Sequence, residues 1–246
     1  MKILLAYYSR SGHTERLAQA IAAELRARGH ELAIEKIQVA EHRGKWRLAL
    51  PLLTTLPILP FYLLLEPVRT WWLRRYHQQE QPIVAPAHAD ASDFDRVCIG
   101  GPKWLYIAYP VARYLRQMDG LRDKRIGAFA SFCGPPLKVF ELEMLFDPLR
   151  RRIEGKQATL ATTMAVSSHH HEFFFYSEME YMFRMLSWLC FRRPLRAFTL
   201  DSEWGRGEVQ RYCNELLGTE LDSGKWERQR QQEQCAGRSK LPAGTP

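Results

Sequence analysis

Ile3-Leu4-Leu5-Ala6-Tyr7-Tyr8 is a continuous apolar run near the start of the chain, and a polar turn, Ser9-Arg10-Ser11-Gly12-His13-Thr14, follows it directly. Such a run is typical of a parallel strand that is buried on both faces. Residues 14–28 then carry apolar side chains at helical spacing, and Gly29 stands where a helix C-terminal glycine is expected. Residues 31–37 have the pattern of a second strand. We therefore predict a strand–helix–strand unit that opens a doubly wound sheet.

The same alternation returns later in the chain. It predicts strands at 96–99, 125–132 and 159–166 and helices at 110–118, 139–153 and 208–217. The predicted fold class is α/β, a doubly wound five-stranded parallel sheet of order 2-1-3-4-5 with two largely helical insertions. We expect one domain over 1–224, insertions at about 40–93 and 167–204, and a disordered tail at 225–246.

Composition narrows the function classes. The chain has 246 residues, of which 46% are hydrophobic, and this content excludes disordered and fibrous proteins. Its net charge of +8 favours phosphates, nucleic acid or anionic lipid as partners. No nucleic-acid-binding motif accompanies the charge, so nucleic acid is not expected. The five cysteines lack regular spacing, and the first apolar run is too short for a signal peptide; both favour the cytoplasm.

The turn after the first strand has the composition of an anion site. It combines three hydroxyl residues and a glycine at the start of a helix, where backbone N–H groups and the helix dipole attract an anion. Neither GxxxxGK[ST] nor GxGxxG is present, so the loop favours a phosphate monoester over a nucleoside triphosphate or a dinucleotide. The alternative is that the serines and the glycine only form the turn, while Thr14 caps the helix.

Two further loops follow strands of the same predicted sheet. Gly100-Gly101-Pro102-Lys103-Trp104 follows the third strand, with two glycines that allow a close backbone approach and a flat aromatic ring. Ser131-Phe132-Cys133-Gly134 follows the fourth strand. Because the carboxyl ends of parallel strands meet at one edge, we expect the three loops to converge on one crevice.

Residues 7–14 and 100–104, and more loosely 131–134, resemble the FMN-binding loops of the flavodoxin-like family, which includes flavodoxins and NAD(P)H:quinone oxidoreductases. The resemblance covers about half of the chain. It implies noncovalent FMN, with the phosphate on the first loop and the ring against Trp104. Gly101 departs from the family, because many relatives have a hydroxyl residue there. The cofactor-binding residues that the resemblance implies are Ser9, Arg10, Ser11, Gly12, His13, Thr14, Gly100, Gly101, Pro102, Lys103, Trp104, Ser131, Phe132, Cys133 and Gly134.

The first insertion holds an uncharged stretch, Leu48–Leu65, that approaches transmembrane length. Pro51, Pro57 and Pro60 interrupt it, so a single straight span is disfavoured. Cationic and aromatic residues flank it, and residues 45–75 are therefore a candidate for contact with an anionic membrane surface. The alternatives are a cap over the cofactor domain and a homodimer interface.

The second insertion contains His169-His170-His171 and an aromatic run, Phe173–Tyr176. Three adjacent histidines cannot all reach one metal from a regular backbone, and HExxH is absent, so no metal site is expected. Beside the crevice, one of these histidines could donate a proton to a substrate or simply form a hydrogen bond. Tyr106 and Tyr109 are further candidate substrate contacts.

The basic charge and the two insertions differ from the small acidic electron carriers that the resemblance includes. We therefore expect an FMN-dependent oxidoreductase for a hydrophobic, ring-containing substrate, a quinone being the leading class, with NAD(P)H as the candidate electron donor. The protein would be cytoplasmic, or peripheral on the inner face of the membrane. The alternatives are a flavodoxin-type electron-transfer protein for a membrane-bound or other redox partner, and a scaffold without flavin.

Overall fold

The computed structural model describes residues 1–40, 80–103, 107–168 and 176–218, together with residues 57, 61, 64–68, 70 and 71. Within these residues, five parallel strands form one sheet in the predicted order, β2-β1-β3-β4-β5. The strands are β1 (Lys2–Tyr7), β2 (Glu31–Lys36), β3 (Arg96–Pro102), β4 (Arg125–Phe132) and β5 (Thr159–Ser167). The helices are α1 (His13–Ala27), α5 (Tyr109–Gln117), α6 (Met144–Gly155), α7 (Tyr176–Phe191) and α8 (Glu203–Leu217), with a π-helical segment η1 (Lys138–Glu143) and a 3-10 turn η2 (Leu195–Phe198).

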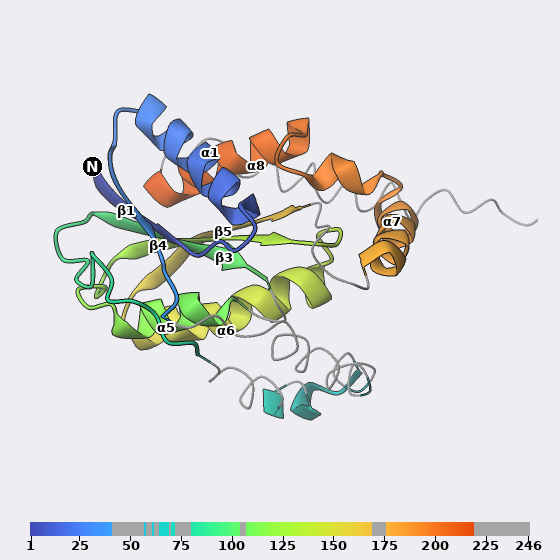
Figure 1. Cartoon of the computed structure of the whole chain (residues 1–246), viewed down its shortest axis with the longest axis horizontal. Helices are drawn as coiled ribbons and strands as arrows, with labels where there is room; N and C mark the ends of the chain where they lie inside the picture. The colour runs from blue at the N-terminus through green and yellow to red at the C-terminus, as the bar shows by residue number, and fades with distance from the viewer. Residues whose placement is uncertain are drawn as a thin grey trace, which may run out of the picture.

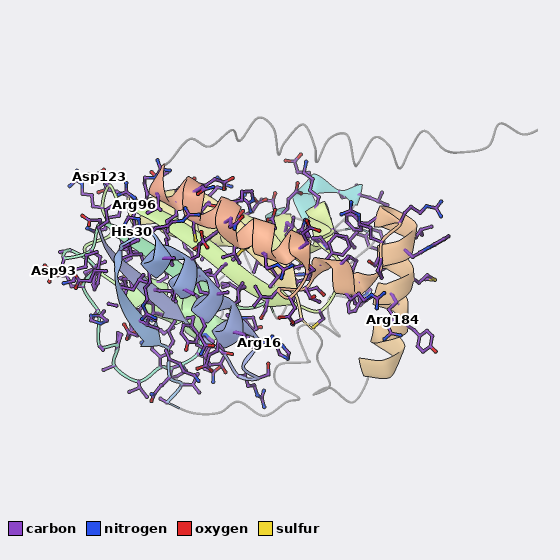
Figure 2. The ribbon with its side chains drawn as sticks, turned by 90° about the horizontal axis from the view of Figure 1, so that it is seen from above. Arg16, His30, Asp93, Arg96, Asp123 and Arg184 are labelled. Carbon is purple, nitrogen blue, oxygen red and sulfur yellow. The ribbon has the colours of Figure 1, made fainter. Side chains whose placement is uncertain are left out.

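Helices cover both faces of the sheet. Helices α1 and α8 lie on one face and α5 and α6 on the other (Figure 1). Alternate residues of β1 serve the two layers: Ile3 and Leu5 pack under α1 and α8, while Leu4 packs under α5 and α6. Seen from above, α1 and α8 lie side by side, and Arg16 of α1 pairs with Asp201 at 2.9 Å (Figure 2). The uninterrupted apolar run of β1 is therefore explained by burial on both faces.

The predicted helix at 139–153 is two segments. Residues 138–143 form a π-helical turn, in which the N–H of Leu142 donates to the carbonyl of Leu137 at 3.1 Å, and α6 begins at Met144. Pro148 lies inside α6, four residues after Met144. Because proline has no backbone N–H, it cannot donate a hydrogen bond to the carbonyl of Met144. The helix type therefore changes at the residue whose carbonyl lacks the usual donor four residues later.

The last helix starts earlier than the predicted Glu208. Helix α8 begins at Glu203, because the Ser202 hydroxyl accepts the N–H of Gly205 at 3.0 Å and so caps the first turn. Gly205 is required at this point, since a Cβ there would lie 2.2 Å from the carbonyl oxygen of Thr199. Glycine has a low helix propensity, but the close approach of the backbone requires it at this position.

Two backbone hydrogen bonds join residues 38–40 to residues 82–84. The N–H of Ala40 donates to the carbonyl of Pro82 at 3.1 Å, and the N–H of Val84 donates to that of Gln38 at 2.9 Å. Gln38 and Ala40 lie just beyond the carboxyl end of β2. Residues 80–93, at the end of the predicted insertion, are therefore attached to the domain body.

A buried carboxylate holds the returning chain. Glu35 of β2 accepts the backbone N–H of Ala87 at 2.7 Å, that of His88 at 3.1 Å and the hydroxyl of Tyr114 at 2.7 Å. Three donors satisfy a charge that is otherwise costly to bury. Residues 87 and 88 are thereby fixed against β2 and α5.

Several predictions fall wholly or largely outside the described residues. They include most of Leu48–Leu65, the histidines 169–171 and the tail at 225–246. Among the helices that the structure does describe, none combines the length and the apolar character needed to cross a membrane. The division of the chain into one domain with two insertions and a tail stays a prediction.

Candidate functional site

The three predicted loops meet at the carboxyl edge of the sheet. Beyond the strand ends, the N–H of Tyr8 donates to the carbonyl of Gly100 at 3.0 Å, and the N–H of Lys103 donates to that of Ser131 at 2.8 Å. Helix α1 leaves β1 toward one face of the sheet, and α5 leaves β3 toward the other. The edge between β1 and β3 is therefore the topological switch point, where doubly wound sheets bind their ligands.

The first loop turns into α1 through Gly12. This glycine has φ 88°, in the left-handed region that glycine enters without strain, and no heavy atom lies within 4 Å of where its Cβ would be. The hydroxyl of Ser9 accepts the N–H of Gly12 at 3.1 Å, which leaves the Ser9 proton able to point toward a ligand. Ser11 and His13 are half-buried, and Arg10 is exposed. The loop thus places accessible polar groups at the positive end of α1, with open space beside Gly12.

Thr14 contacts a residue at the end of β4. Its side chain is buried, and its hydroxyl lies 2.7 Å from the hydroxyl of Ser131 at the end of β4. The residue at the N-cap position of α1 is Gly12, so Thr14 does not cap the helix. Two residues that the sequence suggests as separate cofactor contacts are therefore in contact with each other, and their bond ties the first loop to the third.

This bond predicts a non-additive effect on stability. Thr14→Val should lower the free energy of unfolding by about 1–3 kcal/mol, because it leaves the buried Ser131 hydroxyl without its partner, and Ser131→Ala should cost a similar amount. The double variant should cost little more than either single variant, since both partners are then gone. Urea unfolding of the four proteins measures this coupling. Additive losses would show that the two hydroxyls do not depend on each other.

The first three residues of the predicted second loop lie within β3, which extends to Pro102, and packing requires both of its glycines. A Cβ on Gly100 would lie 2.1 Å from the ring of Phe129 in β4, and a Cβ on Gly101 would lie 2.7 Å from Val111 of α5. Both glycines are therefore needed by the core, whatever they also allow a ligand to do. Beyond β3, an antiparallel bridge joins Lys103 to Ile107.

The predicted contacts around this loop are only partly described. Tyr109 is buried at the start of α5, while Trp104 and Tyr106 lie outside the described residues. In the third loop, Phe132 packs in the core on the α5 and α6 face, Gly134 is buried, and Cys133 is half-buried. Ser131 and Phe132 thus point to opposite faces, as neighbours on a strand must.

An acidic side chain beside the first loop is held by partners that the sequence does not reveal. Glu15, in the first turn of α1, accepts the hydroxyl of Tyr7 at 3.1 Å and pairs with Lys36 at 2.8 Å. Tyr7 and Lys36 are partners in the β1–β2 register, which brings both to the same strand ends. The sequence indicates these contacts of Glu15 only weakly, because all it shows is that a tyrosine and a lysine each end a predicted parallel strand.

The charges in this group are mutually satisfied. The hydrogen bond from Lys36 holds the pKa of Glu15 below its ordinary value. Burial, and next the Glu15 carboxylate, raise the pKa of Tyr7 to about 12. At neutral pH the carboxylate therefore stays ionised and the phenol keeps its proton. Because Lys36 neutralises Glu15, an anion at the first loop does not face an uncompensated negative charge.

Of the predicted catalytic candidates, only Tyr109 lies within the described residues, buried at the start of α5. His169, His170 and His171 lie outside the described residues, as does the aromatic run up to residue 175. In the part of the chain that is described, no group of three or more histidine, cysteine or acidic side chains is arranged to hold a metal ion. The described part of the candidate site is the loop between β1 and α1, which the bond between Thr14 and Ser131 ties to β4.

Solved structures with a similar arrangement are flavoproteins and flavodoxins. A flavoprotein in complex with FMN from Lactobacillus acidophilus matches at 19% identity and a TM-score of 0.47, over 67% of this chain and 92% of that chain. Flavodoxin 1 from Bacillus cereus matches at 12% identity and a TM-score of 0.45, over 90% and 100% of the two chains. Flavodoxin 2 from the same organism matches at 14% identity and a TM-score of 0.47, over 89% and 100%.

No protein-family model and no curated protein matches the sequence. The fold is instead assigned from the geometry of the sheet itself. Five parallel strands in the order 2-1-3-4-5, with α1 and α8 on one face and α5 and α6 on the other, give this chain the flavodoxin-like fold.

Proposed function

We propose that the protein binds FMN noncovalently at the carboxyl edge of its sheet and is an FMN-dependent oxidoreductase. Its proposed substrate is a hydrophobic, ring-containing molecule, with a quinone as the leading class, and its proposed electron donor is NAD(P)H. The observation that carries the proposal is the loop from Ser9 to Thr14, which meets the N-terminus of α1 at the switch point of a flavodoxin-like sheet.

The residues of this loop fit the phosphate monoester of FMN. Gly12 leaves open space on its Cβ side, and the Ser9 hydroxyl can donate outward while it accepts the N–H of Gly12. The positive end of the α1 dipole favours an anion at this place, and the acidic side chain in the first turn of α1, Glu15, is neutralised by Lys36. A compact, doubly charged group is therefore better suited to the loop than a neutral ligand.

FMN would supply the transfer of one or two electrons, while the protein supplies orientation and access. Ser9 would hold the phosphate through its hydroxyl. The bond between Thr14 and Ser131 would keep the loop at a fixed distance from β4, and so fix the cofactor relative to the other strand ends. The contact of Trp104 with the flavin ring and the role of His169–His171 as proton donors remain part of the proposal.

The described cysteines support a reducing compartment. Cys98, Cys133, Cys190 and Cys213 are all free thiols, and two of them are fully buried. We accordingly propose a cytoplasmic location, in which such thiols persist. Contact of residues 45–75 with an anionic membrane surface is proposed on the sequence pattern, and the described residues of that segment include exposed apolar side chains at Phe61, Leu64 and Trp71.

The test begins with the absorption spectrum of the purified protein, before and after addition of FMN. The expected result is a yellow protein with a bound flavin spectrum, which then oxidises NAD(P)H faster when a quinone is added. A protein that stays colourless in excess FMN would refute the cofactor and with it the enzyme. A protein that binds FMN but reduces no quinone with NADH or NADPH would contradict the substrate class and favour an electron-transfer protein.

A further inference from the structure

Three arginines on the α5 and α6 face of the sheet meet at one carboxylate. In α5, Arg116 pairs with Glu80 at 2.8 Å, and Arg113 lies 3.5 Å from the same side chain. In α6, Arg152 pairs with Glu80 at 3.1 Å. The two helices pack against each other (Figure 1), which brings guanidinium groups from both to one place. We call Arg113, Arg116 and Arg152 the arginine cluster.

The arginine cluster lies toward the amino edge of the sheet. Helix α5 starts beyond the carboxyl end of β3 and runs back along the sheet, and α6 ends shortly before β5 begins. Arg116 and Arg152 each belong to the last turn of their helix. The cluster is therefore separate from the loop between β1 and α1, which lies at the opposite edge and meets the other face.

Glu80 does not take up all the donors of the cluster. Among the described residues, the buried Nε of Arg113 has no hydrogen-bond partner, and the 3.5 Å contact of Arg113 with Glu80 is long for a hydrogen bond. An unpaired buried donor on a charged group is costly. The side chains of Arg113 and Arg116 are 33% and 54% exposed, so a ligand can reach both from solvent.

The charge around Glu80 is positive. Three guanidiniums and one carboxylate leave about +2 within this group of described residues. Helix α5 contains no acidic residue. The acidic residues of α6, Asp147 and Glu154, are exposed and lie about 140° and 160° around the helix from Arg152. Neither of them therefore faces the cluster.

The acidic residues beyond the two helices have partners of their own. Asp119, which follows α5, lies 3.9 Å from Lys156. Asp90 accepts the N–H and the hydroxyl of Ser92 at 2.9 and 2.6 Å. Lys156 adds a further cation, and its ammonium group donates to the carbonyl of Met118 at 3.0 Å. The positive charge of the cluster is therefore not cancelled by these carboxylates.

We propose that the arginine cluster is a binding site for a phosphate group. A tetrahedral oxyanion with two negative charges matches the surplus charge, and its oxygens fit the planar forks of guanidinium groups. The phosphate would accept hydrogen bonds from Arg116 and from the Nε of Arg113, while Glu80 holds the guanidiniums in place. The proposal does not depend on a bound flavin.

The alternative is that the three arginines only anchor Glu80 and complement the dipoles of their helices. The two roles differ in the effect of Glu80→Gln. If the cluster binds phosphate, loss of a like charge beside the ligand should tighten phosphate binding several-fold. If the arginines only anchor Glu80, the same change should leave phosphate binding unaltered.

The experiment is calorimetric titration of the full chain with inorganic phosphate at low ionic strength. The parent protein carries Gly12→Asp, so that the loop before α1 does not contribute a second phosphate site. We expect Arg113→Gln and Arg116→Gln each to weaken phosphate binding about tenfold, and Glu80→Gln to strengthen it. Acetate, with a single charge, should bind at least about tenfold more weakly than phosphate.

Arg150→Gln is the matched control. Arg150 is exposed on the same helix as Arg152 and lies about 160° around it, so the change removes one positive charge away from the cluster. It should leave phosphate binding unchanged, and circular dichroism shows that each variant is folded. A loss with Arg150→Gln equal to that with Arg116→Gln would mean general charge attraction and would overturn the proposal.

Vesicles identify the source of the phosphate. The same proteins are sedimented with phosphatidylcholine vesicles, with and without phosphatidic acid. Binding to phosphatidic acid that Arg116→Gln abolishes assigns the phosphate to a lipid headgroup, and phosphate binding without vesicle binding assigns it to a soluble ligand. A parent protein that binds neither inorganic phosphate nor these vesicles overturns the proposal.

Discussion

Gly12→Asp is expected to lower the affinity for FMN about a hundredfold or more, because it places a carboxylate where the cofactor's phosphate is proposed to bind and like charges in contact cost several kcal/mol. The new side chain has room, since no heavy atom lies within 4 Å of the Cβ position at Gly12. Aspartate also tolerates left-handed backbone better than most residues, so the fold should persist. Fluorescence quenching of FMN on titration with apoprotein measures the affinity.

Gly29→Asp is a closely matched control for this change. Gly29 follows the same helix at its other end, has φ 80° against 88° at Gly12, and likewise has no atom within 4 Å of its Cβ position. Both variants add one negative charge and one strained aspartate. The control even suffers more from the helix dipole, which disfavours an anion at the C-terminus. Equal loss of FMN affinity in both variants would show that the loop before α1 does not hold the phosphate.

Gly100→Ala is expected to lower the free energy of unfolding by about 3 kcal/mol, an overpacking cost at the upper end of the usual range. The added Cβ would lie between 2.1 and 2.4 Å from three atoms of the Phe129 ring, which is fully buried. A closely packed ring cannot move aside without displacing its neighbours, among them Tyr212 at 6.3 Å between ring centroids. Urea unfolding monitored by circular dichroism measures the loss.

A second substitution separates packing from ligand binding at this glycine. Phe129→Leu removes part of the ring that Gly100→Ala would meet, so the double variant should be more stable than Gly100→Ala alone, although Phe129→Leu is itself destabilising. If Gly100 serves the core, the double variant should also bind FMN nearly as well as Phe129→Leu does. A rescued fold with lost FMN binding would instead mean that the glycine is needed for the approach of the cofactor.

Local patterns predict most of the fold because they report burial and turn chemistry directly. The apolar run of β1 and the helical spacing of α1 each lie within a few neighbouring residues, and both elements form within one residue of the predicted bounds. Element ends were predicted less well. The start of α8 depends on a cap by Ser202 and a close approach at Gly205, and α6 begins four residues before Pro148. In each case one residue outweighs the average propensity of its segment.

The candidate site was predicted as a place but not as a set of contacts. Its loops meet at one edge because parallel strands have their carboxyl ends together. The bond between Thr14 and Ser131 joins residues 117 positions apart, and no local pattern indicates which hydroxyls become partners. The neutralisation of Glu15 by Lys36 likewise depends on the β1–β2 register. Such pairs follow from strand register and helix placement, which a single sequence does not encode locally.

The sequence by itself determined a doubly wound parallel sheet and the place of the polar loop before α1, because burial period and turn composition are local properties of the chain. Only the tertiary structure decided which contacts require the glycines and which face of each helix is buried. Gly100 is required by a ring on the neighbouring strand, and α7 turns Phe183 inward and Trp188 outward although both are apolar. The physical reason is that burial depends on which surfaces the rest of the chain covers, and distant segments supply that cover.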